Sequence, residues 1–120
     1  MGTGEPKRVV LVVDDEPAIR LLCKVNLELA GYEVREAGTL AAARTQLDDD
    51  VAVVLLDMHV GNERGESLLG ELRARRVPVA VVTGSTDLEA LAESADAVLG
   101  KPFTIDELEA TVARLAGADV

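Results

Sequence analysis

Four apolar runs in this chain each lead into a polar residue, and segments with helical periodicity lie between them. These runs are Val9–Val13, Val51–Leu56, Val77–Val82 and Ala97–Leu99. Val51–Leu56 is apolar at every position, which is typical of a strand covered on both faces. Glu33–Ala37 alternates polar and apolar residues, as a half-exposed edge strand does. Strands that alternate with helices favour β-α-β units and a parallel sheet.

Helices are predicted between these strands from their start and stop signals. Pro17 suits a first helical turn, and Gly31 ends that helix after Ala30. Thr39 can cap a second helix, and Thr104-Ile105-Asp106-Glu107 has the spacing of a capping box. The predicted helices span Pro17–Ala30, Thr39–Leu47, Glu66–Arg75, Asp87–Ser94 and 105 to about 116, and a loop with Gly61 and Gly65 precedes the third.

The strand patterns also predict the order of the sheet. The composition typical of central strands is found in Val9–Val13, Val51–Leu56 and Val77–Val82, the first, third and fourth strands along the chain. The second and fifth, Glu33–Ala37 and Ala97–Leu99, have the composition of edge strands. The order 2-1-3-4-5 satisfies this division with short right-handed crossovers. The predicted fold class is therefore α/β, a doubly wound (βα)5 domain with a five-stranded parallel sheet. We expect one domain over residues 1–120, with an ordered core of about 8–116.

Polar residues follow the strands where such sheets bind their ligands, at the carboxyl edge. They are Asp14, Asp15, Asp57, Thr83 and Lys101. An isolated aspartate after a strand is usually a cap or turn residue, so the combination carries the prediction. Three neighbouring carboxylates would raise one another's pKa, and a bound cation relieves this repulsion. An all-oxygen site favours Mg²⁺.

The same residues suit phosphoryl transfer. Asp57 could attack phosphorus and become an acyl phosphate. Lys101 supplies a positive charge, and Thr83 with the backbone at Gly84 offers donors to phosphate oxygens. The contribution of the protein would be positioning and charge neutralisation.

Composition narrows the classes of partner. With 120 residues, 48% of them hydrophobic, the chain can bury a core. A net charge of −10 argues against nucleic acid or an anionic membrane as the direct partner. Tyr32 and Phe103 are the only aromatic residues, which excludes a stacking platform. The single Cys23 fits a reducing compartment, and with neither a leader nor a membrane-spanning run we expect a cytoplasmic protein.

These motifs resemble those of the two-component response-regulator receiver family. The resemblance rests on Asp14-Asp15-Glu16-Pro17, Asp57, Thr83-Gly84 and Lys101-Pro102-Phe103, and it covers Arg8 to about Ala116. It implies a flavodoxin-like fold and a domain that catalyses only its own phosphorylation and dephosphorylation. Asp57 would accept the phosphoryl group from a histidine kinase or a histidine phosphotransfer protein. Thr83, Gly84 and Lys101 would contact the phosphoryl oxygens, and the Lys101–Pro102 peptide would be cis.

The resemblance also implies how the metal is held. Asp15 and Asp57 would ligate Mg²⁺ together with the backbone carbonyl of His59, and Asp14 would act mainly through a metal-bound water. A metal role for the His59 ring is disfavoured because Mg²⁺ prefers oxygen. That ring either lies exposed in a loop or, with Ser85, lies beside the phosphoryl group and controls water access.

Two departures from the family leave an alternative open. Val98 stands where most receivers carry Tyr or Phe, and the stretch from Thr83 to Lys101 is short by about one helical turn. An interaction module that works without phosphate is the alternative. A phosphohydrolase would need a second aspartate where His59 stands, and a flavin protein would lack its hydroxyl-rich phosphate loop. No effector domain is expected after the fifth helix, and a single-domain regulator and a domain of a longer protein both remain open.

The first helix carries two apolar lines. The first is expected to pack on the sheet and comprises Ile19, Leu22, Cys23 and Leu27. The second comprises Leu21, Val25 and Leu29 at i, i+4 and i+8. It is part of a wide buried stripe, a set of scattered exposed apolar residues of the ordinary kind, or a docking surface. The docking surface would serve the kinase or phosphotransfer protein, since receivers often bind these partners through this helix. The docking hypothesis predicts that Leu21 and Val25 are substantially exposed.

Overall fold

The computed structural model describes residues 7–84 and 95–117. Its main sheet contains β1 (Val9–Val13), β2 (Glu33–Ala37), β3 (Val51–Asp57), β6 (Val79–Thr83) and β7 (Ala97–Gly100). The described helices are α1 (Pro17–Leu29), α2 (Leu40–Gln46), α3 (Glu66–Ala74) and α5 (Ile105–Ala116). None of these helices is long and apolar enough to cross a membrane. The helix predicted over Asp87–Ser94 lies outside the described residues.

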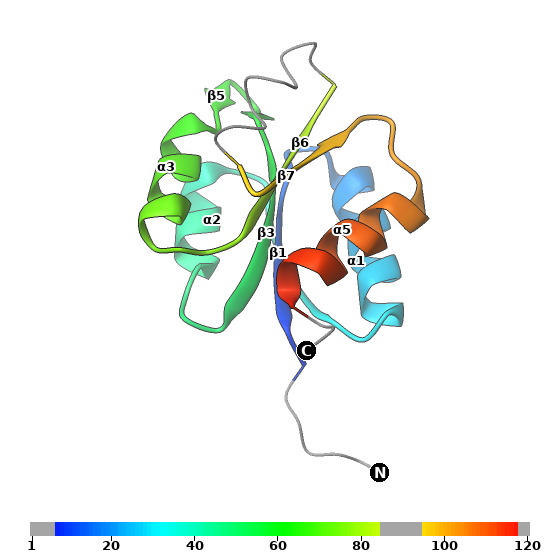
Figure 1. Ribbon diagram of the computed structural model, residues 1–120. Helices are drawn as coiled ribbons and strands as arrows, with labels where there is room; N and C mark the ends of the chain where they lie inside the picture. The colour runs from blue at the N-terminus through cyan, green and yellow to red at the C-terminus, as the bar shows by residue number, and fades with distance from the viewer. Residues whose placement is uncertain (1–6, 85–94, 118–120) are drawn as a thin grey trace.

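The sheet is parallel and has the order β2-β1-β3-β6-β7. Counted along the chain over the strands of this sheet, that is the predicted order 2-1-3-4-5. Helices α1 and α5 cover one face of the sheet, and α2 and α3 cover the other (Figure 1). The doubly wound α/β prediction is therefore confirmed.

Burial on both faces explains why the central strands are continuous apolar runs. In β1, Leu11 and Val13 pack in the core beneath α2 and α3, whereas Val10 and Val12 pack in the core beneath α1 and α5. Every residue of β1 is buried. The alternation of β2 likewise matches its place at the edge of the sheet, where only Ala37 is buried.

The caps form as their sequence signals predict. Thr104 Oγ1 accepts a hydrogen bond of 3.0 Å from the Glu107 amide, and Glu107 Oε1 accepts one of 2.8 Å from the Thr104 amide, which completes the capping box. Thr39 caps α2 through the Ala42 amide. Strand β6 begins at Val79, later than predicted, because Pro78 has no N–H to donate to the sheet.

The segment after β3 differs from the predicted glycine-containing loop. It folds into a small antiparallel hairpin of β4 (His59–Val60) and β5 (Glu63–Arg64). Gly61 adopts a φ of +63° at its turn, a conformation that glycine reaches without the steric penalty of a side chain. The hairpin follows Asp57 directly, so it borders the carboxyl edge of the sheet.

Helix α1 is more exposed along its apolar residues than predicted. Cys23 and Leu27 are buried against the sheet, and burial, with the nearby charge of Asp14, raises the pKa of the Cys23 thiol to about 11. Leu22 is 40% exposed, so the prediction of its burial is wrong. One residue along a helix is a rotation of about 100°, which turns Leu22 away from the face that carries Cys23.

The exposure predicted for Leu21 and Val25, on the second apolar line, is confirmed. Leu21 is 59% exposed, Val25 46% and Leu29 80%. Helix geometry places them with Leu22 on one side of α1, and we call these four residues the α1 apolar surface. Large apolar side chains gathered on one helix face mark an interaction site more often than scattered ones do.

The end of α3 carries an arginine where a glycine is usual. The Val77 amide donates to the Leu72 carbonyl and the Arg76 amide to the Arg73 carbonyl, the two bonds of a Schellman cap. Arg76 therefore has a φ of +61°, a left-handed conformation that is unfavourable for a residue with a side chain. We expect Arg76→Gly to raise the free energy of unfolding by about 0.5–1 kcal/mol, as measured by urea titration.

The neighbouring Arg75 provides the matched control. Its φ of −89° is an ordinary right-handed value, and Arg75→Gly removes the same charge. That variant should lower the free energy of unfolding, because glycine there gains no steric relief and adds entropy to the unfolded chain. Equal effects of the two substitutions would show that charge, rather than backbone conformation, governs this cap.

Candidate functional site

The carboxyl edge of the sheet brings the predicted polar residues together. Asp14 follows β1, Asp57 and Thr83 end β3 and β6, and Lys101 follows β7. These residues lie side by side because β1, β3, β6 and β7 are consecutive neighbours in the sheet. The predicted convergence of side chains from different strands is confirmed.

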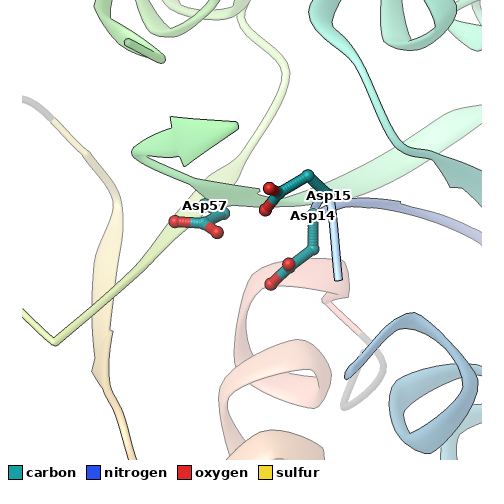
Figure 2. Close-up of side chains that lie close together, drawn as sticks. All are labelled: Asp14, Asp15 and Asp57. Carbon is teal, nitrogen blue, oxygen red and sulfur yellow. The ribbon is translucent and has the colours of Figure 1, made fainter. Parts of the chain in front are cut away.

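Three carboxylates form the acidic part of the site. One oxygen each of Asp14, Asp15 and Asp57 lies within 4.8 Å of the others, and the three side chains come from the adjacent ends of β1 and β3 (Figure 2). Asp14 is 3% and Asp57 7% exposed, whereas Asp15 is open to solvent. Carboxylates this close repel one another strongly when water is excluded. The donor set therefore fits a hard divalent cation.

Lys101 supplies the positive charge opposite these carboxylates. Its Nζ lies 3.3 Å from Asp14 Oδ2 and 3.4 Å from Asp57 Oδ2. Burial on its own lowers the pKa of Lys101, but the two carboxylates outweigh burial and raise this pKa above its usual value. The ammonium group is therefore charged at neutral pH. The Lys101 amide also donates to the Thr83 carbonyl, and the Lys101–Pro102 peptide is cis, as the resemblance implied.

Neighbouring groups shift the pKa of Asp57 in opposite directions. Burial raises the pKa of its carboxyl group, and the charge of Asp14 raises it further. The His59 amide, which donates to Asp57 Oδ1 at 3.0 Å, and the ammonium of Lys101 act in the opposite direction. Burial prevails, so the pKa of Asp57 is higher than that of an ordinary aspartate. An additional cation at the site would lower it again and favour the ionised, nucleophilic form.

Backbone contacts orient Asp14. Its Oδ1 accepts a hydrogen bond of 2.9 Å from the Glu16 amide, and its own amide donates to the Ala37 carbonyl of β2. The sequence analysis did not identify Arg20, whose Nη1 donates to the Asp14 carbonyl at 2.7 Å. The available signal was an arginine in the first turns of the helix that directly follows paired aspartates.

The remaining predicted residues lie at or just beyond the same carboxyl edge of the sheet. Thr83 is 3% exposed, and Gly84 after it is exposed. The His59 side chain is exposed, and its amide contacts Asp57 as described above. Ser85, suggested as a companion of the His59 ring, lies outside the described residues.

Comparison with known proteins identifies the family. The model of the response regulator receiver domain matches residues 10–113. The chain belongs to the response regulator receiver family. The transcriptional regulatory protein KdpE of Mycobacterium tuberculosis is 39% identical over 116 residues, which cover 92% of this chain and 50% of that protein. The receiver thus spans about half the length of this curated relative.

Solved receivers share the fold. A CheY-like response regulator receiver domain protein from Methanospirillum hungatei superposes with a TM-score of 0.83 and 28% identity, covering 95% of this chain and 96% of that one. The response regulator TrrA of Thermotoga maritima, solved in complex with Mg²⁺-BeF, gives a TM-score of 0.79 and 30% identity, with coverage of 90% and 98%. Val98, where the family resemblance leads us to expect an aromatic residue, is a half-buried residue of β7 that pairs with Val81.

Proposed function

We propose that this receiver accepts a phosphoryl group on Asp57 from a histidine kinase or a histidine phosphotransfer protein, in Mg²⁺-dependent two-component signalling in the cytoplasm. The observation that carries the proposal is the position of Asp57. Its buried carboxylate lies 3.4 Å from the ammonium of Lys101 and beside the carboxylates of Asp14 and Asp15. That arrangement suits a nucleophile surrounded by groups that stabilise phosphoryl oxygens.

Each residue of the site would have a separate role in the phosphoryl transfer. A carboxylate oxygen of Asp57 forms the new bond to phosphorus while the bond from phosphorus to the donor histidine nitrogen breaks, and the proton balance is completed on the released imidazole. Lys101, placed between Asp14 and Asp57, neutralises charge on the phosphoryl oxygens. Thr83 and the backbone at Gly84 donate hydrogen bonds to those oxygens. Positioning and electrostatics supply the rate enhancement.

The acidic residues fit Mg²⁺. Asp15 and Asp57 would hold it through side chains, His59 through its backbone carbonyl, and Asp14 through a bound water. Two observations support this assignment: all the donor atoms are oxygens, and one oxygen of each of the three aspartates lies within 4.8 Å of the other two. When bound, Mg²⁺ neutralises phosphate charge and offsets the repulsion among the carboxylates.

Phosphorylation by a small donor tests the proposal. Purified protein is incubated with acetyl phosphate and Mg²⁺, and its intact mass is measured over time. We expect a gain of one phosphoryl group with Mg²⁺ and no gain with EDTA. No gain with acetyl phosphate or with phosphorylated phosphotransfer proteins would favour the interaction module that needs no phosphate, the alternative that Val98 suggests.

Metal removal should change the stability of this receiver. At a Mg²⁺ concentration ten times the dissociation constant, binding should add about 1.4 kcal/mol to the free energy of unfolding. For a domain of this size that raises the melting temperature by roughly 5 °C. Differential scanning calorimetry with Mg²⁺ and with EDTA measures the shift, which Asp15→Asn should largely abolish.

The control for this shift is Asp50→Asn, which removes an exposed carboxylate from the loop before β3. This variant should keep the full stabilisation by Mg²⁺. If Asp15→Asn retained the wild-type shift, the metal would not be held at the carboxyl edge of the sheet.

The α1 apolar surface is the proposed docking site for the phosphoryl donor. Helix α1 begins at Pro17, directly after the acidic residues of the site, so a partner on this helix can bring a histidine to Asp57. Leu21, Val25 and Leu29 supply apolar contacts for a helix of the partner. The assignment of this surface rests both on its exposure and on its proximity to the acidic residues of the site.

A charge placed on this surface separates docking from chemistry. We expect Val25→Arg to slow phosphotransfer from a phosphorylated histidine phosphotransfer protein by about tenfold or more, because it puts a charge into an apolar contact. Labelling by acetyl phosphate should stay at the wild-type rate. Ala110→Arg, on the exposed face of α5, is the control and should change neither rate. A Val25→Arg variant with normal transfer would contradict docking on α1.

A further inference from the structure

We propose that Arg20 is a positioning residue that fixes the Asp14–Asp15 turn for Mg²⁺ binding; this inference rests on the proposed function. Arg20 extends from α1, and its Nη1 donates a hydrogen bond of 2.7 Å to the backbone carbonyl of Asp14. Its side chain is only 20% exposed. A charged donor at this distance makes a strong hydrogen bond to a carbonyl.

This contact affects Asp15, the one exposed residue among the three carboxylates of the site. The Asp14 carbonyl belongs to the peptide group that joins Asp14 to Asp15, so fixing that oxygen fixes the plane from which Asp15 extends. Asp14 is already oriented by the Glu16 amide and by Lys101. Asp15 is exposed, and its position depends on the backbone that carries it. Arg20 therefore prepares the ligand that would otherwise be least ordered.

Glu36 in β2 and Gly38 just after this strand surround the guanidinium. Glu36 Oε1 lies 3.4 Å from Arg20 Nε, so its negative charge offsets that of the guanidinium close to a cation site. At Gly38, a Cβ atom would lie 3.0 Å from Arg20 Nη1 and 3.6 Å from its Cζ. The absence of a side chain at residue 38 therefore lets the guanidinium lie here without a tight contact. Helix α1 and the end of β2 thus meet at this one contact with the Asp14 carbonyl.

Positioning and simple stabilisation make different predictions. If Arg20 merely linked α1 to β2, its replacement would lower the free energy of unfolding and leave Mg²⁺ affinity unchanged. If Arg20 positions the turn, Mg²⁺ affinity must fall. Arg20→Lys keeps the charge but has a single terminal nitrogen, which cannot reproduce the planar fork that reaches Asp14 and Glu36 together. We expect this variant to raise the Mg²⁺ dissociation constant by about tenfold, as loss of an outer contact to a metal ligand does.

Gly38→Ala tests the same contact without changing Arg20 or any charge. The added methyl group must push the guanidinium back by a few tenths of an ångström from a hydrogen bond of 2.7 Å, so this variant should also raise the Mg²⁺ dissociation constant. Gly70→Ala is its control, because a Cβ atom there meets no atom within 4 Å. Arg44→Lys is the control for Arg20→Lys, since Arg44 forms a comparable ion pair with Glu71 away from the site.

Isothermal titration of the full chain with Mg²⁺ measures the dissociation constants, and urea unfolding with EDTA measures metal-free stability. We expect Arg20→Lys and Gly38→Ala to weaken Mg²⁺ binding while both controls match the wild type. Wild-type affinity in Arg20→Lys, whatever its stability, would overturn the inference. Asp15→Asn distinguishes failure of the proposed metal site from failure of the role inferred for Arg20. If Asp15→Asn binds Mg²⁺ normally, the proposed metal site itself is wrong; if only Asp15→Asn binds weakly, the inference about Arg20 alone fails.

Discussion

Asp57→Asn should abolish phosphorylation of this receiver, with labelling by acetyl phosphate lowered more than about 10³-fold. Asparagine has the size of aspartate but no anionic oxygen to attack phosphorus. The substitution also removes one of two buried carboxylates beside Lys101, so the metal-free fold should be retained. Intact mass spectrometry under the conditions that label the wild type measures the loss.

Asp50→Asn is the matched control for this prediction. It makes the same chemical change at an exposed carboxylate in the loop before β3, and we expect it to label at the wild-type rate. A circular dichroism spectrum of Asp57→Asn that matches the wild type would exclude unfolding as the cause of lost labelling. Undiminished labelling of a folded Asp57→Asn protein would place the acceptor at another residue.

Lys101→Met should give the second largest effect, a fall of about 10²–10³-fold in the labelling rate. Methionine keeps an unbranched apolar stem but removes the ammonium that lies between Asp14 and Asp57. The charge that stabilises the phosphoryl oxygens is then lost. Initial rates of mass gain with saturating acetyl phosphate and Mg²⁺ measure the effect.

The same variant should show a pH-dependent loss of stability without metal. Lys101 opposes the rise in the pKa of Asp57, so its removal raises that pKa further. A carboxyl group whose folded pKa exceeds its unfolded value destabilises the fold as the pH rises through the folded pKa. Urea unfolding in EDTA should therefore give Lys101→Met a free energy of unfolding about 1–3 kcal/mol below that of the wild type at pH 7. The difference between the two proteins should be smaller at pH 5.

Lys7→Met serves as the control, because Lys7 is an exposed lysine outside the site. It should leave both the labelling rate and the pH profile unchanged. A Lys101→Met protein that labels like the wild type would contradict the assigned role of the ammonium. Wild-type stability of that protein at pH 7 would contradict the electrostatic coupling to Asp57.

The sequence predicts the sheet well because burial leaves a direct mark on composition. Val51–Leu56 is apolar throughout since β3 is covered on both faces, and Glu33–Ala37 alternates since β2 is an edge strand. With the strand order known, the meeting of Asp14, Asp57 and Lys101 follows from parallel topology alone.

What the sequence does not predict depends on side-chain direction and on contacts between distant residues. Leu22 is apolar like its neighbours, and only the rotation of α1 on the sheet shows that it is exposed. The hairpin after Asp57 depends on pairing of His59 with Arg64, which no periodicity indicates in so short a segment. The contact of Arg20 is not predicted because its partner is a backbone carbonyl, so the only signal is the arginine in the helix after the paired aspartates.

The most direct test of the central claim locates the phosphoryl group itself. Protein labelled with acetyl phosphate and Mg²⁺ is reduced with borohydride, which converts an aspartyl phosphate to homoserine, then digested and sequenced by tandem mass spectrometry. We expect homoserine at position 57 and unmodified aspartate at positions 14 and 15. Labelled protein with intact aspartate at 57, or with the modification on another residue, would contradict it.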